Sequence, residues 1–184
     1  MRVVLCSRNP HKARELERLL PGWTIEPLER DDYPPESGAT YYENAATKAA
    51  FGRENASGWV LAEDSGLEVS VLDGRPGVLS ARYALEGAPA VAKLLGELEG
   101  IEQRAARYVS ELVLLDPEGR ELRGTGILEG RIAHEPAGSE GFGYDPIFVP
   151  DGEERTVAEL GDEWKAGSSH RARAARALLV ALQR

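Results

Sequence analysis

Basic and polar side chains lie between an expected strand and an expected helix near the start of the chain. The segment Ser7–Lys12 reads Ser-Arg-Asn-Pro-His-Lys, with Asn9 as a helix N-cap and Pro10 as the first helical residue. Three cations therefore stand at a helix N-terminus, which already carries a partial positive charge and free N–H groups. A bound phosphate would relieve this conflict, whereas the alternative is a surface turn with solvated cations. The candidate phosphate-binding residues are Ser7, Arg8, Asn9, Pro10, His11 and Lys12.

A second basic segment surrounds the start of the last expected helix. Lys165 precedes the expected N-cap at Ser168 or Ser169, and His170 and Arg171 follow it, where acidic side chains are usual. Two such helix starts in an acidic protein indicate the two ends of one site for a polyanion. For His170 alone, the alternative is a surface histidine with ordinary hydrogen bonds.

Acidic side chains follow a short apolar run at Trp59–Ala62. Glu63 and Asp64 stand at the carboxyl end of this expected strand, where α/β sheets place ligands. In an extended chain the two side chains point to opposite faces, so we expect one of them to face the site. Mg²⁺ takes one or two carboxylates together with waters and substrate phosphates, and Glu36 with Asp64 would meet that need. The alternative is a plain Asp-Ser-Gly turn.

An aromatic segment follows a Gly-x-Gly bend and is expected to be a strand over Gly141–Val149. In an extended chain Phe142 and Tyr144 share one face, which can stack against a planar base. Asp145 adds an acceptor for a base or a ribose. The alternative is that the two aromatic rings form a pair in the hydrophobic core.

The elements that must position these residues alternate between strand and helix early in the chain, and strands predominate later. This order predicts an α/β fold with a mixed sheet flanked by helices. Expected strands are Arg2–Cys6, Trp23–Leu28, Trp59–Ala62, Leu67–Leu72, Tyr108–Leu115, Glu121–Ile132 and Gly141–Val149. Expected helices are Pro10–Leu20, one from the Thr40/Glu43 capping box to Gly52, Pro89–Leu98, Thr156–Leu160, and a last one with Ala175, Leu178, Leu179 and Leu182 on one face.

The composition predicts one cytoplasmic domain over residues 1–184. A net charge of −9 argues against a partner that is a nucleic acid, although residues 1–14 carry four basic side chains and no acidic one, and residues 164–184 carry five and none. This asymmetry favours a small anionic ligand, with two solvated basic helices as the alternative. The apolar runs are too short for a membrane span or an export signal. The one cysteine, Cys6, is expected to be a buried apolar residue in a reducing compartment.

Lysine is scarce in this chain. Four of the 22 basic residues are lysines, and a protein so rich in arginine can retain lysine where a compact ammonium group is needed. Genome composition or a warm habitat would produce the same bias. The four are Lys12, Lys48, Lys93 and Lys165.

Six short motifs lie in order along the chain between Val3 and Ala181. They are Ser7-x-Asn9-x-His11-Lys12-x-x-Glu15-Leu16, Glu36-Ser-Gly-x-Thr40-x-x-Glu43-Asn44-Ala45-x-x-Lys48-Ala49, Glu63-Asp64-Ser65-Gly66-Leu67, Pro76-Gly77-Val78-x-Ser80-Ala81-Arg82-Tyr83, Gly141-Phe-Gly-Tyr-Asp-Pro-Ile-Phe148 and Ser169-His170-Arg171. Together they resemble the inosine triphosphate pyrophosphatase family, whose members are non-canonical purine nucleoside triphosphate pyrophosphatases.

The resemblance implies an Mg²⁺-dependent homodimeric hydrolase that converts ITP, dITP and XTP to the monophosphate and pyrophosphate. It implies an elongated fold with two lobes around a central nucleotide-binding cleft. By matching position, Ser7–Lys12 would hold the triphosphate, Asp64 would be the metal-linked proton acceptor, and Glu36 would help to hold Mg²⁺. The other implied nucleotide contacts are Ser65, Phe142, Gly143, Tyr144, Asp145, Lys165, His170 and Arg171. The chain departs from the family pattern at Glu63, where Asp is common, and at Arg8, where Gly is frequent.

Phosphoanhydride hydrolysis chiefly needs positioning and charge neutralisation, which Lys12 and Lys165 would supply. A donor from His170 or Arg171 would pair with the 6-oxygen of hypoxanthine or xanthine and would face another donor in adenine. Two other functions fit the same residues. One is a pyrophosphatase for modified pyrimidine nucleotides, and the other is a nucleotide-binding module without catalysis.

Overall fold

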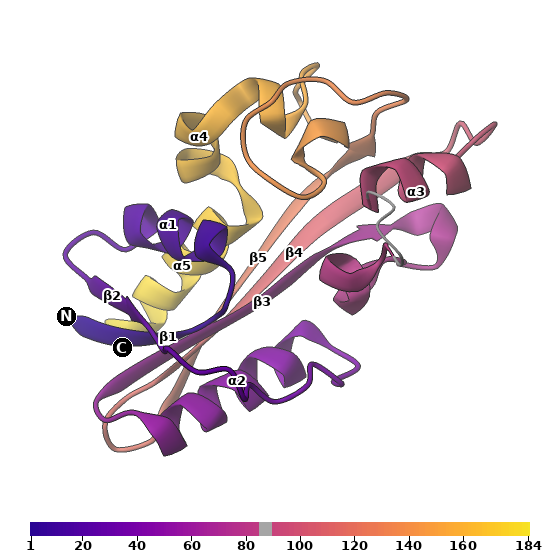
Figure 1. The fold of residues 1–184 in the computed structure, drawn as a ribbon. Coiled ribbons are helices and arrows are strands. Elements are labelled where there is room, and N and C mark those ends of the chain that lie inside the picture. The colour runs from indigo at the N-terminus through magenta and orange to yellow at the C-terminus, as the bar shows by residue number, and fades with distance from the viewer. Residues whose placement is uncertain (85–89) are drawn as a thin grey trace. The chain divides into compact units, whose positions relative to one another are not determined.

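The computed structural model describes residues 1–84 and 90–184, and within them strands and helices alternate over the first half of the chain (Figure 1). The strands are β1 (Arg2–Cys6), β2 (Thr24–Pro27), β3 (Trp59–Val69), β4 (Ala105–Leu115), β5 (Glu121–Ile132) and β6 (Phe148–Pro150). The helices are α1 (Pro10–Leu19), α2 (Tyr41–Asn55), α3 (Ala90–Glu97), α4 (Val157–Ser168) and α5 (His170–Leu182). The expected start of a helix at Pro89 lies outside the described residues.

The strands form one six-stranded sheet in the order β2-β1-β3-β4-β5-β6. Strand β1 pairs in parallel with β2, where Val3 lies opposite Ile25, and in parallel with β3, where Val3 lies opposite Trp59. Strands β5 and β6 pair in antiparallel fashion, with Ile132 opposite Phe148. The predicted mixed sheet is therefore confirmed.

Contacts divide the chain into two compact units. The first unit comprises Met1–Asp64, Ser110–Gly126 and His170–Arg184, and the second comprises Ser65–Val109 and Ile127–Ser169. Strands β3, β4 and β5 each contribute residues to both units. The expectation that residues 1–184 act as one catalytic domain stays a prediction.

The core of the first unit follows the alternation of side chains along its strands. On one face Leu5 and Leu61 belong to a buried cluster with residues of α1 and α5, such as Leu16 and Leu178. On the other face Cys6 belongs to a cluster with alanines of α2. In Figure 1, α2 accordingly lies on one side of β1 and β3, and α1 and α5 lie on the other.

The first two helices begin where their capping residues predict. The Asn9 side chain caps α1, and Pro10 is its first residue. Thr40 and Glu43 form a complete capping box at α2, in which the Glu43 carboxylate accepts from the Thr40 N–H at 3.1 Å. Glu43 therefore has the structural role expected of it, and α2 runs three residues beyond the expected end at Gly52.

The second unit has its own hydrophobic core. Leu67 from β3, Leu94 from α3, Phe148 from β6 and Val157 from α4 are all buried in one cluster. Beside it, the buried Arg104 side chain donates hydrogen bonds to three backbone carbonyls, those of Leu98, Ile101 and Ala133. These bonds give the buried guanidinium group the hydrogen-bond partners that water would otherwise supply. They connect the start of β4 to the segment after α3 and to the segment after β5.

Three expected elements differ from the structure. Strand β3 continues through Asp64-Ser-Gly66 instead of breaking there, because Leu67 and Val69 alternate into the second core and extend the strand. Of the expected Gly141–Val149 strand only Phe148 and Val149 are extended, as part of β6, since Gly141 and Gly143 take positive φ angles of 77° and 63°. Helix α4 extends to Ser168, eight residues beyond the expected end, with a kink at Gly161.

Candidate functional site

The loop between β1 and α1 forms hydrogen bonds with itself. Ser7 Oγ accepts from the Asn9 N–H at 3.2 Å, and Asn9 Oδ1 accepts from the N–H groups of His11 at 2.9 Å and Lys12 at 3.4 Å. Two of the N–H groups expected to bind phosphate are thus already capped by Asn9. Arg8 is exposed and lies 5.5 Å from the centre of the Tyr33 ring.

The positive charge of Lys12 at this helix start is compensated by a residue of β3. Its Nζ lies 2.7 Å from Glu63 Oε2, and the Glu63 side chain is fully buried. Glu63 Oε1 accepts from Ser110 Oγ and from Arg171 Nε, both at 3.1 Å. Burial alone would raise the pKa of Glu63, but Arg171 and Lys12 hold that pKa well below its usual range.

Arg171, in the first turn of α5, lies between two carboxylates of the first unit. It pairs with Glu63 and also, through Nη1, with Glu15 of α1. Burial alone would lower the pKa of Arg171, but the two carboxylates raise it above its usual range. His170 is also buried. The contacts of Arg171 in this structure are structural ion pairs, and its role in base recognition stays a prediction.

Asp64 lies on the opposite face of β3 from Glu63, as its place one residue along the strand predicts. Its Oδ2 accepts from the Asn44 amide at 3.0 Å, and its Oδ1 lies 3.3 Å from Lys48 Nζ. Lys48 Nζ also donates to Glu36 Oε1 at 2.6 Å. Helix α2 therefore holds the two carboxylates, Glu36 and Asp64, against one ammonium group.

The charges in this cluster shift its titration. Burial raises the pKa of Asp64, and the nearby Lys48 and Lys12 only partly oppose that rise. Burial alone would lower the pKa of Lys48, but Asp64 and Glu36 outweigh it and raise that pKa. Asp64 is therefore poised to accept a proton more readily than an ordinary aspartate.

The same cluster is the place to test whether the chain fits a magnesium ion. Glu36 and Asp64 are hard oxygen donors that already converge on a single cation, the ammonium of Lys48. Mg²⁺ needs few carboxylates when substrate phosphates and waters complete its shell. In the described residues no three His, Cys, Asp or Glu side chains group together as a metal site. The pair Glu36 and Asp64 thus fits an ion that is held jointly with a substrate.

The second unit contains a separate polar centre at Asp145. Asp145 Oδ2 accepts from Lys165 Nζ at 2.8 Å and from the Phe142 N–H at 2.9 Å, while Oδ1 accepts from the Tyr108 hydroxyl at 3.3 Å. The Lys165 ammonium also lies 4.8 Å from the centre of the Phe142 ring. Three predicted site residues, Phe142, Asp145 and Lys165, are therefore in mutual contact.

Lys165 does not stand before a helix start as expected. It lies in the last turn of α4, where a cation matches the partial negative charge of the helix end. The prediction that Lys165 is a cation placed at a helix N-terminus is therefore wrong. Its contact with Asp145 is what places it among the candidate site residues.

The remaining candidates of the second unit differ in exposure. Tyr144 is 4% exposed, belongs to the hydrophobic core, and donates to the Ser80 carbonyl at 3.1 Å. Phe142 is half-buried and Gly143 is exposed. The expectation of an extended aromatic face is wrong, because the chain turns between Phe142 and Tyr144. Ser65, on β3, is half-buried.

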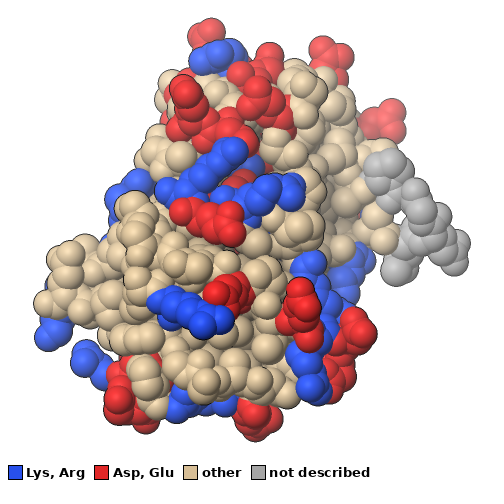
Figure 2. Space-filling view, turned by 60° about the vertical axis from the view of Figure 1, so that its left-hand side comes forward, with Lys and Arg blue, Asp and Glu red and all other residues tan. Residues whose placement is uncertain are grey.

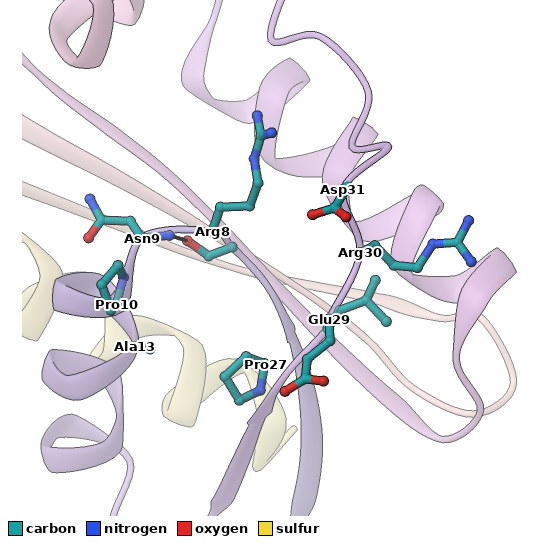
Figure 3. Close-up of a pocket in the computed structure, with 10 residues that line it drawn as sticks. Arg8, Asn9, Pro10, Ala13, Pro27, Glu29, Arg30 and Asp31 are labelled. Carbon is teal, nitrogen blue, oxygen red and sulfur yellow. Dashed lines mark hydrogen bonds between the residues drawn. The ribbon is translucent and has the colours of Figure 1, made fainter.

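A pocket of about 400 Å³ lies in the first unit beside the β1–α1 loop. It lies at the carboxyl ends of the parallel strands β1 and β2, and Figure 3 shows the loop at the start of α1 on one side and the segment after β2 on the other. Its lining residues are Ser7, Arg8, Asn9, Pro10, Ala13, Pro27, Leu28, Glu29, Arg30 and Asp31. Four of the six residues of the predicted phosphate loop therefore line an open hollow.

Several residues that contact the candidate site residues were not predicted from the sequence to belong to the site. Lys48, Asn44 and Glu15 all contact candidate residues, and all three stand in the sequence motifs without an assigned role in the site. The scarcity of lysine was the one signal that pointed to Lys48.

The surface does not carry a continuous basic patch on the face drawn in Figure 2, where acidic and basic side chains are interspersed. No helix in the described ranges has the length and apolar character needed to cross a bilayer.

Comparisons with known proteins match the chain along almost its whole length. A model of the Ham1 family matches residues 3–181. A dITP/XTP pyrophosphatase of Thermus thermophilus is 46% identical over 192 residues, covering 98% of this chain and 91% of that protein. One of Deinococcus deserti is 44% identical over 183 residues, covering 97% and 88%. The solved structure of the Staphylococcus aureus Ham1 protein matches with a TM-score of 0.87 at 33% identity, covering 100% of this chain and 98% of that one.

Proposed function

The chain belongs to the Ham1 family, and on that premise we propose that it hydrolyses non-canonical purine nucleoside triphosphates to the monophosphate and pyrophosphate. It is a hydrolase acting on phosphoanhydrides, and ITP, dITP and XTP are its substrates. The observation that carries the chemistry is the convergence of Glu36 and Asp64 on the Lys48 ammonium, close to the Lys12–Glu63 ion pair.

The first unit supplies the residues for the phosphates. Lys12 and the N-terminus of α1 offset the negative charge of the triphosphate, with Ser7, Arg8 and His11 beside them. Lys48 provides a second ammonium next to the carboxylates. When substrate arrives, its phosphate oxygens can replace a carboxylate as the partner of Lys48, which leaves Glu36 and Asp64 available to a metal ion.

Glu36 and Asp64 would hold Mg²⁺ together with the substrate phosphates. The bound ion would polarise the phosphoryl oxygens and neutralise charge that develops during the reaction. Asp64 orients the attacking water and accepts its proton, a role that suits a carboxylate whose pKa is raised by burial. The water oxygen bonds to the α-phosphorus, the bond to the bridging oxygen breaks, and pyrophosphate leaves.

The remaining candidate residues are those that the family resemblance implies for the nucleoside. Phe142 offers a ring for stacking, and Lys165 and Asp145 add a donor and an acceptor beside it. A donor from His170 or Arg171 pairs with the 6-oxygen of hypoxanthine or xanthine. Adenine presents an amino donor at that position, so a buried donor would be left unpaired and ATP would be rejected.

The test is an assay of pyrophosphate release with Mg²⁺ across ITP, dITP, XTP, GTP, ATP and modified pyrimidine triphosphates. We expect kcat/KM for ITP, dITP and XTP to exceed that for ATP by about 10²-fold or more. Comparable turnover of ATP would remove the proposed base recognition. Faster turnover of the pyrimidines would favour the alternative substrate class, and tight ITP binding without turnover would favour a binding module.

We further propose that the protein acts as a cytoplasmic homodimer. The family resemblance implies this assembly. Sedimentation or light scattering of the purified protein measures the oligomeric state directly, and a monomer over the working concentration range would contradict it.

A further inference from the structure

Glu63 differs from the other acidic residues of the first unit in how completely it is enclosed. Its side chain has no exposed surface, and its two oxygens have separate sets of partners. Oε1 accepts from Ser110 and Arg171, whereas Oε2 lies against Lys12. A buried carboxylate needs such donors to remain ionised, and here they come from α1, β4 and α5.

The partners of Oε1 are themselves held in place. Arg171 is 2% exposed, and its guanidinium is also paired with Glu15, so it cannot turn away from Glu63 without also breaking its ion pair with Glu15. Ser110 approaches from β4 and occupies a second direction at the same oxygen. The Glu63 carboxylate is thereby fixed in orientation, and Oε2 is directed at Lys12.

Lys12 reaches solvent, whereas Glu63 and Arg171 do not. Its side chain is 14% exposed, while that of Glu63 is 0% exposed. A lysine has four rotatable bonds and holds one position only when a partner restrains it. Oε2 of Glu63 is the buried partner that restrains the Lys12 side chain. This ion pair holds the ammonium group near the start of α1.

We propose that Glu63 is a positioning residue, which fixes the Lys12 ammonium for the triphosphate while Arg171 and Ser110 fix Glu63. This inference rests on the proposed function, since it takes Lys12 as a phosphate-binding residue. It assigns to Glu63 no contact with substrate and no part in proton transfer. Arg171 then influences phosphate binding indirectly, because it fixes Glu63, which in turn fixes Lys12. This role is separate from any contact between Arg171 and the base.

The test is a double-mutant cycle with Glu63→Gln, Lys12→Ala and the two combined. Binding of inorganic tripolyphosphate is measured by calorimetry without metal, and KM and kcat are measured for ITP and XTP with Mg²⁺. We expect Glu63→Gln to weaken tripolyphosphate binding about tenfold or more when Lys12 is present. In the Lys12→Ala background the same change should have little further effect, because the residue it acts through is gone.

Two comparisons separate positioning from general damage to the fold. Glu111→Gln alters another buried glutamate of the first unit, which pairs with Arg123 and Thr125 and not with Lys12, and it should leave tripolyphosphate affinity unchanged. The KM values for ITP and XTP should rise by the same factor in Glu63→Gln, because the phosphates are common to both. A change in the ITP to XTP ratio would overturn the inference and place Glu63 in base recognition.

If Glu63→Gln does not fold, Glu63→Asp keeps the charge but shortens the reach to Lys12 by one methylene group. It should weaken tripolyphosphate binding by a smaller factor, again only when Lys12 is present. Equal losses with and without Lys12 would overturn the inference for either variant. A wild-type protein that neither binds tripolyphosphate nor hydrolyses ITP would instead overturn the proposed function.

Discussion

A buried carboxylate pairs with a lysine at Glu63 in the first unit and at Asp145 in the second, but these two centres are built differently. In the first unit Glu63 meets two cations, Lys12 and Arg171, and a second carboxylate balances Arg171. In the second unit Asp145 pairs with Lys165 and also accepts from neutral donors, the Phe142 N–H and a tyrosine hydroxyl. The first is a network of charges, and the second is an ion pair supported by dipoles.

This difference determines how each centre should respond when one of its side chains is removed by substitution. A charge network loses its balance when any member is removed, because a neutral donor such as the Ser110 hydroxyl does not replace a lost charge. Asp145 retains two hydrogen bonds without its lysine. The first centre also joins residues from four elements of the fold, whereas the Asp145 centre lies largely within the Gly141–Lys165 segment. We expect the first unit to be the more sensitive to substitution and the second the more tolerant.

The largest expected effect is on kcat, and it distinguishes a residue of the chemical step from residues that bind the nucleoside. Asp64→Asn removes the proposed proton acceptor, so kcat for ITP should fall by about 10²- to 10⁴-fold while nucleotide binding persists. Asp145→Asn disturbs only the proposed nucleoside contacts and should raise KM more than it lowers kcat. Steady-state pyrophosphate release checks both variants, and a fully active Asp64→Asn would remove Asp64 from the reaction.

The next effect concerns stability and compares the cations of the two centres. Arg171→Met leaves the buried Glu63 and the half-buried Glu15 without their shared partner, and we expect it to cost about 3–5 kcal/mol of unfolding free energy. Lys165→Met leaves Asp145 with the Phe142 N–H and the Tyr108 hydroxyl, and we expect about 1–3 kcal/mol. Urea unfolding followed by circular dichroism measures both. A larger loss for Lys165→Met would reverse the comparison.

A smaller effect tests how tightly the Asp145 centre is packed. A Cβ at Gly141, whose φ is +77°, would lie 2.1 Å from Asp145 Oδ2, so Gly141→Ala must displace that carboxylate. Gly152→Ala is the matched control, since Gly152 has φ +84° and no atom within 4 Å of an added Cβ. We expect the control to cost about 1 kcal/mol for the backbone strain. Gly141→Ala should cost about 2 kcal/mol more, from the disturbed hydrogen bonds of the carboxylate. Equal losses in thermal unfolding would show that Asp145 has room to move.

The smallest expected effect is in thiol labelling at Cys6, which reports unfolding of the first unit separately from the second. Cys6 is the only cysteine in the chain, lies in the first unit, and is fully buried, and burial raises its pKa to about 12. At pH 8 the thiol is therefore neutral and shielded, so a disulfide reagent should label the native protein very slowly and label one thiol per chain in denaturant. Labelling at intermediate urea should follow opening of the first unit alone. Rapid labelling without denaturant would contradict the tight packing around Cys6.

The sequence predicted those parts of the fold whose signals are local. Asn9 followed by Pro10, and Thr40 followed by Glu43, place two helix starts correctly because a cap is decided by residues within three positions of one another. The opposite faces of Glu63 and Asp64 follow from the same kind of local rule. The family resemblance, carried by six short motifs in order, is confirmed by the full-length matches.

The remainder depends on contacts that are distant along the chain. An Asp-Ser-Gly sequence favours a turn, yet β3 continues through it because Leu67 enters a core formed by residues far along the chain. Glu63 meets Arg171 108 residues later, and no spacing rule connects the two. The Gly-x-Gly bend was visible in the sequence, but its position was not, since the positive φ angles at Gly141 and Gly143 separate two aromatic residues whose spacing is typical of a strand.

The composition of the first unit has a consequence for how the protein is made. Every residue of the second unit, from Ser65 to Ser169, is synthesised before Arg171. Helix α5, whose Ala174, Ala175 and Leu178 complete the core around Leu61, therefore leaves the ribosome after the whole second unit. Until it emerges, Glu63 lacks its arginine and Leu61 lacks part of its apolar cluster. Synthesis of the first unit thus begins before that of the second but ends after it. The first unit can complete its core only once α5 has emerged from the ribosome.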